Sequence, residues 1–419
     1  MSDTQLTKDK ITYRDILSQK EYMKNIVANV ISRFGDSVDA IAYTWLVYQI
    51  TQSAAWSAII YAFNTLPGVI IQPLAGAYVE GVSKKKLMVL SDLIRGIIVA
   101  SLVLLYMNSL VTPIILVVFT LLTTTVESFC LPASSAILPS LLKEEYYEHG
   151  IALNSTLTNV MQLIGLGAAG VIIAVFGIQG AILIDAFSFF GSAFIRGLMH
   201  VKKENLRKDR LNISSYFATL KEGITYVKTK RIILNFCFLA IFLNALMVPL
   251  NALQTPLVVE VLGQGSELLS VICIVMTLAM CVGSFLYPFV AGKCKVNAIV
   301  IVSGFLAGLS LLIFTFGGIF RSNVYLVYVI SIAASFLIGL SVSILTTVLG
   351  VQFTKCIEPN FLARSGAVFN ASATAAMPIT SGLISVLAKV LSVSQIFIIG
   401  FALCVIVFVY IAVSKMQFE

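Results

Sequence analysis

Five ionisable residues of this sequence are candidates for function inside long apolar stretches, where an unpaired charge is costly. They are Arg33, Asp36, Asp39, Glu127 and Asp185. Ionisable groups in such surroundings usually face a cavity or a partner and often carry ions or protons. Glu127 is the most isolated, since no other charge lies within ten residues on either side. Because removal from water favours the protonated form of a carboxylate, Glu127 is predicted to exchange protons near neutral pH.

These charged residues also have structural interpretations. Glu127 could pair statically with Arg33 or hydrogen-bond to polar neighbours. Asp36 lies one turn after Arg33 and could pair with it along the same helix. Asp185, in the stretch Asp185-Ala-Phe-Ser188, falls near the outer end of its apolar run, and a structural role is favoured there. Arg33, Asp36 and Asp185 therefore join Glu127 as candidates for proton coupling.

The composition indicates that a membrane protein must position these side chains. Of the 419 residues, 58% are apolar and 11% are charged, whereas about a quarter of the residues of soluble domains are charged. The net charge of +8 does not indicate nucleic-acid binding, because the cations lie in short clusters between apolar runs. The sequence shows no nucleophile–base pair, metal-ligand cluster, phosphate loop or cysteine framework. Neither an enzyme nor a metal or other cofactor is expected.

Twelve apolar stretches are long enough to cross a bilayer, which takes about 20 residues. They are 22–50, 54–80, 86–107, 112–136, 150–176 and 179–200, then 232–259, 268–292, 296–320, 322–354, 365–388 and 390–414. An even number predicts that both termini lie on the cytoplasmic side. With that orientation, 24 of the 28 cations fall in cytoplasmic segments and two lie outside, as the positive-inside rule requires.

The chain repeats itself at an offset of 215 or 216 residues. The matching positions are Asn29 and Asn244, Asp36 and Asn251, Pro73 and Pro288, Gln179 and Gln395, and the stretches 150–155 and 366–371. The sequence therefore predicts two six-helix halves, 1–200 and 231–419, joined by a cytoplasmic linker, 201–230. Tyr216, Leu220, Ile224 and Val227 give the linker the spacing of an amphipathic helix.

Local motifs resemble the major facilitator superfamily, which is built from two such halves. The segment Gly76-Ala-Tyr-Val-Glu80-Gly-Val-Ser-Lys84-Lys85-Lys86, followed by Asp92 and Arg95, is similar to the family's signature between helices 2 and 3, with Glu80 in place of an aspartate. Further stretches resemble the macrolide-efflux and enterobactin-exporter subgroup. They are Ser32-Arg-Phe-Gly35-Asp36, Pro132-Ala-Ser-Ser-Ala-Ile-Leu-Pro139, Asp185-Ala-Phe-Ser188-Phe, Lys221-Glu222-Gly223-Ile-Thr-Tyr226 and Glu358-Pro359-Asn-Phe-Leu-Ala-Arg364.

The resemblance implies an all-α fold of twelve transmembrane helices and two kinds of structural device. The first is a cytoplasmic gate toward the opposite half, formed by Gly76, Glu80, Lys84, Lys85, Asp92 and Arg95; alternatively, the lysines only anchor a loop. The second is a helix-packing motif, Gly165, Gly167 and Gly170, which resembles the glycine-rich antiporter motif with Leu166 in place of its proline. Pro378 and Gly382 occupy the corresponding region of helix 11.

A substrate cavity is expected among helices 1, 4, 7 and 10. Its candidate residues are Asn29, Tyr43, Phe129, Asn244, Met247, Asn251, Gln254 and Ser341. Methionine, aromatic rings and a few amides suit a bulky amphiphile better than a sugar or an ion. The resemblance implies a monomeric, proton-coupled exporter of a drug-like or siderophore-like compound in a bacterial inner membrane. The alternatives are an uptake transporter of a nutrient or lipid, or a membrane sensor that transports nothing.

Overall fold

The computed structural model describes residues 13–201, 225–357, 359–414, 416 and 418, and these residues form helices and short connections. The helices of the first half are α1 Tyr13–Leu17, α2 Lys20–Thr51, α3 Ala54–Ile70, α4 Gln72–Glu80, α5 Lys84–Met107, α6 Pro113–Ala136, α7 Leu138–Leu141, η1 Glu144–Tyr146 and α8 Tyr147–Gly197. Those of the second half are α10 Arg231–Ala252, α11 Gln254–Pro256, η2 Leu257–Val261, α12 Ser266–Ala291, α13 Val296–Gly317, η3 Gly318–Phe320, α14 Val324–Cys356, α15 Pro359–Leu387 and α16 Val393–Val413.

The described helices account for the twelve expected spans. Eight of them are long and apolar enough to cross a membrane, and one of these, α8, contains two spans. The helix α2, the pair α3 and α4, and α15 supply the remaining three. Polar side chains cap the first turns of several spans and accept hydrogen bonds from backbone N–H groups; these caps are Ser83, Thr112, Asn323 and Ser392.

The long helix α8 is a hairpin of two antiparallel arms. Its backbone leaves helical geometry at Gly177, where φ is +71°, a conformation that glycine adopts without steric cost. Asn29 of α2 accepts a hydrogen bond from Arg196, on the second arm, and donates one to Asn154, on the first. Since both arms meet the same residue of α2 at similar distances from Gly177, they run side by side in opposite directions.

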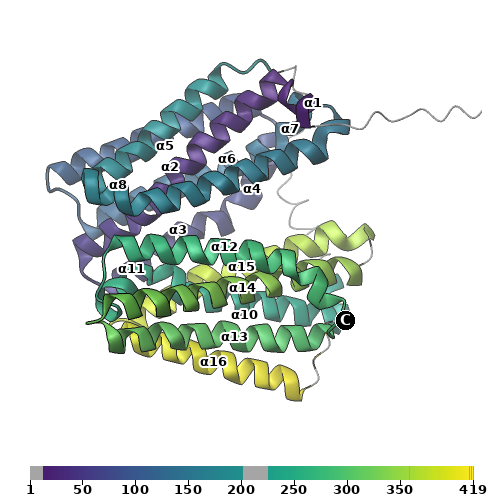
Figure 1. Ribbon diagram of the computed structural model, residues 1–419. Coiled ribbons are helices and arrows are strands. Elements are labelled where there is room, and N and C mark those ends of the chain that lie inside the picture. The colour runs from purple at the N-terminus through teal and green to yellow at the C-terminus, as the bar shows by residue number, and fades with distance from the viewer. Residues whose placement is uncertain (1–12, 202–224, 358, 415, 417, 419) are drawn as a thin grey trace, which may run out of the picture.

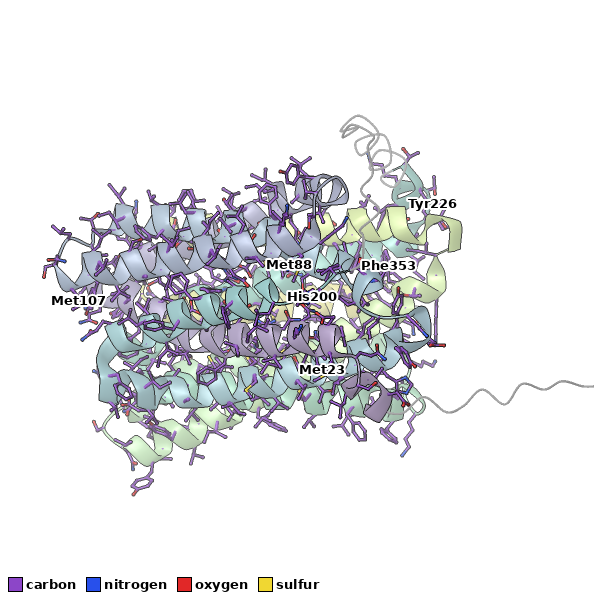
Figure 2. All side chains as sticks on the ribbon, turned by 90° about the horizontal axis from the view of Figure 1, so that it is seen from above. Met23, Met88, Met107, His200, Tyr226 and Phe353 are labelled. Carbon is purple, nitrogen blue, oxygen red and sulfur yellow. The ribbon has the colours of Figure 1, made fainter. Side chains whose placement is uncertain are left out.

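The two halves form two layers of helices that lie against each other (Figure 1). We call the end of the bundle where α2 begins, at Lys20, the near end, and the end where α2 stops, at Thr51, the far end. Figure 2 places Met107, the last residue of α5, at the end opposite Tyr226 and Phe353. The helices therefore run roughly parallel to one axis.

Contacts between the halves lie toward the far end. Ser381 of α15 donates a hydrogen bond to the carbonyl of Ala58, near the start of α3, at 2.6 Å. The hydroxyl of Tyr48, near the end of α2, donates to Glu260 Oε1 of η2 at 3.0 Å. These contacts hold the halves together at the far end.

The predicted linker is only partly described. Residues 202–224, which include Tyr216, Leu220 and Ile224, lie outside the described residues. Residues 225–229 are helical, and Val227 is buried. The domain boundaries and the amphipathic linker helix therefore stay predictions.

Candidate functional site

A cavity of about 530 Å³ lies between the two halves. The first half contributes all the charged residues of its lining, which are Arg33, Asp36, Asp39, Arg95 and Glu127. The wall from the second half is neutral and includes Asn251, Gln254, Thr255, Pro256, Cys273, Met276 and Thr277. The repeat-related positions Asp36 and Asn251 thus lie on opposite walls of one cavity.

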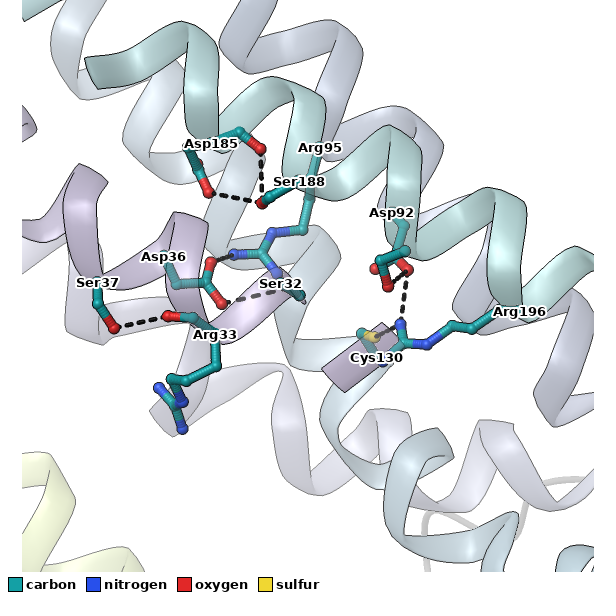
Figure 3. A network of polar contacts seen from close by, with 11 residues as sticks. Ser32, Arg33, Asp36, Ser37, Asp92, Arg95, Cys130, Asp185, Ser188 and Arg196 are labelled. Carbon is teal, nitrogen blue, oxygen red and sulfur yellow. Dashed lines mark hydrogen bonds and ion pairs between the residues drawn. The ribbon is translucent and has the colours of Figure 1, made fainter. Parts of the chain in front are cut away.

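An ion pair between α2 and α5 lies at the centre of the charged wall (Figure 3). The guanidinium of Arg95 donates a hydrogen bond to Asp36 Oδ1 at 2.9 Å. The same guanidinium lies 4.0 Å from the centre of the Phe189 ring, a distance at which the ring face attracts a cation. Its Nε atom is buried without a hydrogen-bond partner. Arg95 is therefore held by one carboxylate and one aromatic face.

This geometry corrects two expectations. Asp36 pairs with Arg95 rather than with Arg33 of its own helix, because Arg33 is exposed and its side chain extends away from Asp36 (Figure 3). Arg95 is also wrongly assigned to a cytoplasmic gate. It lies eleven residues after the start of α5, which is about 17 Å along the helix, and it faces the central cavity.

Glu127 lines the cavity on α6 and is within electrostatic range of Arg95, Asp36 and Arg33. Among the described residues, no hydrogen bond or ion pair reaches its carboxylate, so the static pair with Arg33 does not form. Asp39 also lines the cavity, and its Oδ1 atom is buried without a hydrogen-bond partner. The two carboxylates are thus available to a proton or a ligand.

Asp185 lies behind the cavity wall, where α8 packs against α2. Its side chain is buried and accepts a hydrogen bond from Ser188 Oγ at 3.3 Å. A Cβ atom at Gly35 would lie 2.7 Å from Asp185 Oδ1 and would overlap Ser188, so only glycine permits this approach of α2 to α8. Asp185 is eight residues past Gly177, about 12 Å into the span, which is deeper than the sequence suggested.

A second buried network joins α2, α5, α6 and α8 closer to the near end (Figure 3). Arg196 donates to Asp92 Oδ2 at 2.7 Å, and Ser192 donates to the same oxygen at 2.7 Å. Arg196 also donates to Asn29 Oδ1 at 2.7 Å. All these residues belong to the first half. Asp92 is therefore not part of a gate toward the opposite half here, and Asn29 is a structural residue that does not line the cavity.

The other proposed gate residues lie at the near end. Lys85 Nζ donates to the carbonyl oxygens of Gly197 and Met199, both at 2.7 Å, which ties α5 to the end of α8. Lys84 is buried, and a Cβ atom at Gly76 would meet nothing within 4 Å. The side chain of Glu80 lies outside the described residues. The described hydrogen bonds of Lys85, one of the proposed gate residues, therefore join two helices of the first half.

Glu21 forms a further attachment at the near end. It accepts hydrogen bonds from Lys24 Nζ at 2.9 Å and from the backbone N–H of His200. Burial acts to raise the pKa of Glu21, but the hydrogen bonds and charges of Lys24 and His200 outweigh it and hold that pKa below its ordinary value.

Three of the eight substrate candidates line the cavity, namely Tyr43, Asn251 and Gln254. The other five were wrongly placed there, since they do not line it, and four of them contact other parts of the protein. Phe129 packs edge-on against Tyr78, Asn244 donates to the carbonyl of Ala240, and Met247 packs against the hydrophobic core. Ser341 is buried, and Asn29 belongs to the Arg196 network.

The glycine motif of α8 lies between two helices. A Cβ atom at Gly165 would lie 2.7 Å from the Cβ of Ser37 on α2, and one at Gly170 would lie 3.0 Å from Ser270 Oγ on α12. Gly167 faces Ile274 of α12 at 3.3 Å. These glycines therefore permit close helix packing. Gly382 does not, since nothing lies within 4 Å of its Cβ position, although Pro378 lies inside α15 as expected.

Sequence reasoning missed three residues that the structure brings into contacts. Arg196 lies near the end of the span predicted over 179–200 and was counted only as a positive-inside cation. Glu260 stands just after an uncharged stretch and meets Tyr48 across the halves. Tyr61 lies within hydrogen-bonding reach of Asn251. In the described part of the chain, no group of three or more His, Cys, Asp or Glu residues could hold a metal ion.

Comparisons with known proteins agree with this architecture. Residues 16–418 match the family described as transmembrane secretion effector. The chain is 23% identical to the uncharacterized MFS-type transporter YkuC of Bacillus subtilis, covering 89% of this chain and 86% of the relative. It is 21% identical to macrolide efflux protein A of Streptococcus pyogenes, covering 88% and 90%. The crystal structure of the nucleoside transporter NupG superposes with a TM-score of 0.74 at 12% identity, covering 95% and 99%.

Proposed function

Because this chain belongs to the transmembrane secretion effector family of the major facilitator superfamily, we propose that it is a proton-coupled exporter. Its cargo is an amphiphilic drug-like or siderophore-like compound, which it moves out of a bacterial cell by alternating access. The observation that carries the proposal is the cavity between the halves, which is charged on one wall and neutral on the other.

The charged wall supplies the groups for proton coupling. Arg95 holds Asp36 in an ion pair, whereas Glu127 lines the cavity without a hydrogen bond from any described residue. A carboxylate in such a place exchanges its proton with whatever enters the cavity. Glu127 therefore takes up a proton in one conformation and releases it in the other.

The contacts between the halves support alternating access. The halves are joined at the far end by Tyr48 and Glu260 and by Ser381 and Ala58. If the lysine-rich near end lies in the cytoplasm, as the positive-inside rule favours, this conformation is closed to the outside. Export then requires the far-end contacts to break while near-end contacts between the halves form.

The cavity lining suits an amphiphile. Tyr43, Asn251 and Gln254 offer polar groups, while Val47, Ile60, Leu166 and Met276 offer apolar surface. A lining of this kind binds a bulky compound through apolar burial and orients it with a few polar contacts. Export is favoured over uptake by the resemblance to macrolide efflux protein A.

The test uses purified protein in liposomes with an imposed pH gradient and a pH-sensitive dye inside. Macrolides, siderophores, cationic dyes and lysolipids are added one at a time. We expect proton movement triggered by a compound, and loss of that movement in Glu127→Gln. The matched control is Glu145→Gln, a carboxylate at the near end that is 52% exposed. Undiminished coupled transport in Glu127→Gln would contradict the role of this carboxylate in proton coupling. Transport of the compound in the direction opposite to export would indicate an uptake transporter.

A further inference from the structure

The deepest unpaired charge of the cavity is the carboxylate of Asp39. This residue lines the cavity, yet its Oδ1 atom is buried and accepts no hydrogen bond. The closest candidate partner, Arg95, already donates to Asp36 and lies over the Phe189 ring. Burying a carboxylate oxygen without a partner is costly. A ligand that supplied a positive charge at this point would relieve that cost.

The charged wall carries more acid than base. Four carboxylates lie on it or directly behind it, against two guanidinium groups; they are Asp36, Asp39, Glu127 and Asp185 against Arg33 and Arg95. The opposite wall has no Asp, Glu, Lys or Arg among its lining residues. A cleft lined by one sign of charge concentrates ions of the opposite sign. The charge of this wall therefore favours cations over anions.

Aromatic rings lie in the same cavity. Tyr43 follows Asp39 by one helical turn, and its hydroxyl is fixed by contacts with the carbonyl of Leu116 at 2.9 Å and with Thr120 Oγ1 at 2.7 Å. Tyr61 and Phe119 also line the cavity. Carboxylates combined with aromatic faces are the chemistry that recognises substituted ammonium and other organic cations.

We propose that the transported compound is an organic cation, and that its charged centre binds between the Asp39 carboxylate and the rings of Tyr43, Tyr61 and Phe119. Its apolar body lies against Pro256 and Met276 of the opposite wall. The proposal rests on the transport function proposed above and names the substrate class. Binding through Asp39 also joins the two walls, because the cation contacts the first half while its body contacts the second.

The same carboxylate makes binding compete with protons. Protonation of Asp39 removes the charge that attracts the cation, so affinity falls as the pH is lowered. The groups that interact with Asp39, and that set how readily it is protonated, are Asp36 on the same helix, Arg95 on α5 and Asp185 on α8, together with the hydroxyl of Tyr43. A cation that binds to the protonated form displaces one proton to water, and charge is conserved.

The experiment measures equilibrium binding to the full-length protein in nanodiscs without any pH gradient. The probes are tetraphenylphosphonium, a lipophilic cation, and tetraphenylborate, an anion of the same shape. We expect saturable binding of the cation only, weakened by about 30-fold in Asp39→Asn, as for the loss of one partner of a buried charge pair. Asp39→Glu restores most of the affinity. The control Glu145→Gln, at a carboxylate of the near end that is 52% exposed and does not line the cavity, leaves binding unchanged.

Two results would overturn the proposal. One is binding of tetraphenylborate as tight as that of tetraphenylphosphonium to the wild-type protein, a comparison that needs no variant. The other is unchanged cation binding in a folded Asp39→Asn protein. Neither result contradicts proton-coupled export itself, since the liposome assay with macrolides, siderophores, cationic dyes and lysolipids tests that function independently.

Discussion

The two halves of this protein share one fold but are held together internally by different forces. In the first half, buried ion pairs cross between helices, as Arg95 does to Asp36 and Arg196 to Asp92. In the described residues of the second half, no ion pair is found, and aromatic contacts take that place. Phe236 packs against Phe353 and Phe418, and Phe408 packs against Phe242 and Phe305.

This difference separates two tasks that a transporter must perform. Charged networks respond to protons and cations, because the energy of each group depends on the charge of its neighbours. Packed rings respond to neither. Asp36 and Asn251 occupy equivalent positions of the repeat and show this difference directly, because one places a carboxylate and the other an amide on opposite walls of the cavity. The second half therefore contributes a neutral wall to the cavity, and the first half contributes its charged wall.

The largest effect is expected from replacing Arg95, the cation that pairs with Asp36 in the first half. In Arg95→Gln, Asp36 loses its ion pair, and Asp39, Glu127 and Asp185 lose the nearest positive charge. Leaving a buried charge unpaired costs about 3 kcal/mol, so the unfolding temperature of the purified protein falls and coupled transport is lost. Thermal unfolding in detergent measures the first effect and the liposome assay the second.

A double variant serves as the control for this change. Adding Asp36→Asn to Arg95→Gln removes the unpaired charge, so part of the lost stability returns. If the two substitutions were simply additive, the ion pair would not be what holds α2 to α5, and the contrast between the halves would fail.

The two halves can also be compared by replacing one glycine in a helix of each half with alanine and measuring the change in stability. Gly35→Ala places a Cβ atom against Ser188 and Asp185, where α2 meets α8, and overpacking of this kind costs about 1–3 kcal/mol. Gly382→Ala, in the second half, meets nothing within 4 Å and is expected to leave stability unchanged or raise it by up to about 1 kcal/mol, because alanine is the better helix former. Equal losses of unfolding temperature in the two variants would show that the α2–α8 contact is not specially close.

Much of this architecture can be predicted from the sequence. Hydropathy locates the spans because a bilayer forces each one to satisfy its own backbone. The 215-residue offset indicates the two halves, and the rarity of charge marks Glu127, Asp36 and Asp185 as unusual. These inferences depend on local composition, and the described helices agree with the predicted spans.

Side-chain partners could not be predicted in the same way. Spacing along α2 suggested that Asp36 meets Arg33, but its partner is Arg95, 59 residues away. A one-dimensional pattern reports only which residues share a helix face, whereas the partner is chosen by how α2, α5 and α8 pack. For the same reason five proposed substrate residues do not line the cavity, and the contact of Tyr48 with Glu260 could not be predicted.

The far-end contact tests whether the halves separate as alternating access requires. Tyr48→Phe removes the hydroxyl that donates to Glu260 and leaves the ring. Loss of one such bond is worth about 0.5–1.5 kcal/mol, so the equilibrium shifts severalfold toward the state that is open at the far end. The measurement is the labelling rate of a cysteine introduced at Ala58. A rate unchanged from that of the same cysteine in the wild-type background would show that this contact does not close the far end.

The smallest expected effect concerns the near ends of the two halves, where the stability contributed by one contact should depend on pH in the first half but not in the second. In the first half, Glu21 is held by Lys24 and the backbone of His200, and its pKa lies below the ordinary value of 4.5. In the second half, Asn297 makes neutral hydrogen bonds to Met416 and Phe418.

A carboxylate whose pKa is lowered by folding stabilises the protein above its unfolded pKa, and this contribution is lost as the pH falls through the folded pKa. The difference in unfolding temperature between wild type and Glu21→Gln should therefore be present at neutral pH and shrink below about pH 4.5, whereas that between wild type and Asn297→Ala should stay constant. A difference for Glu21→Gln that persists at low pH would mean that its packing, rather than its charge, ties α2 to the end of α8.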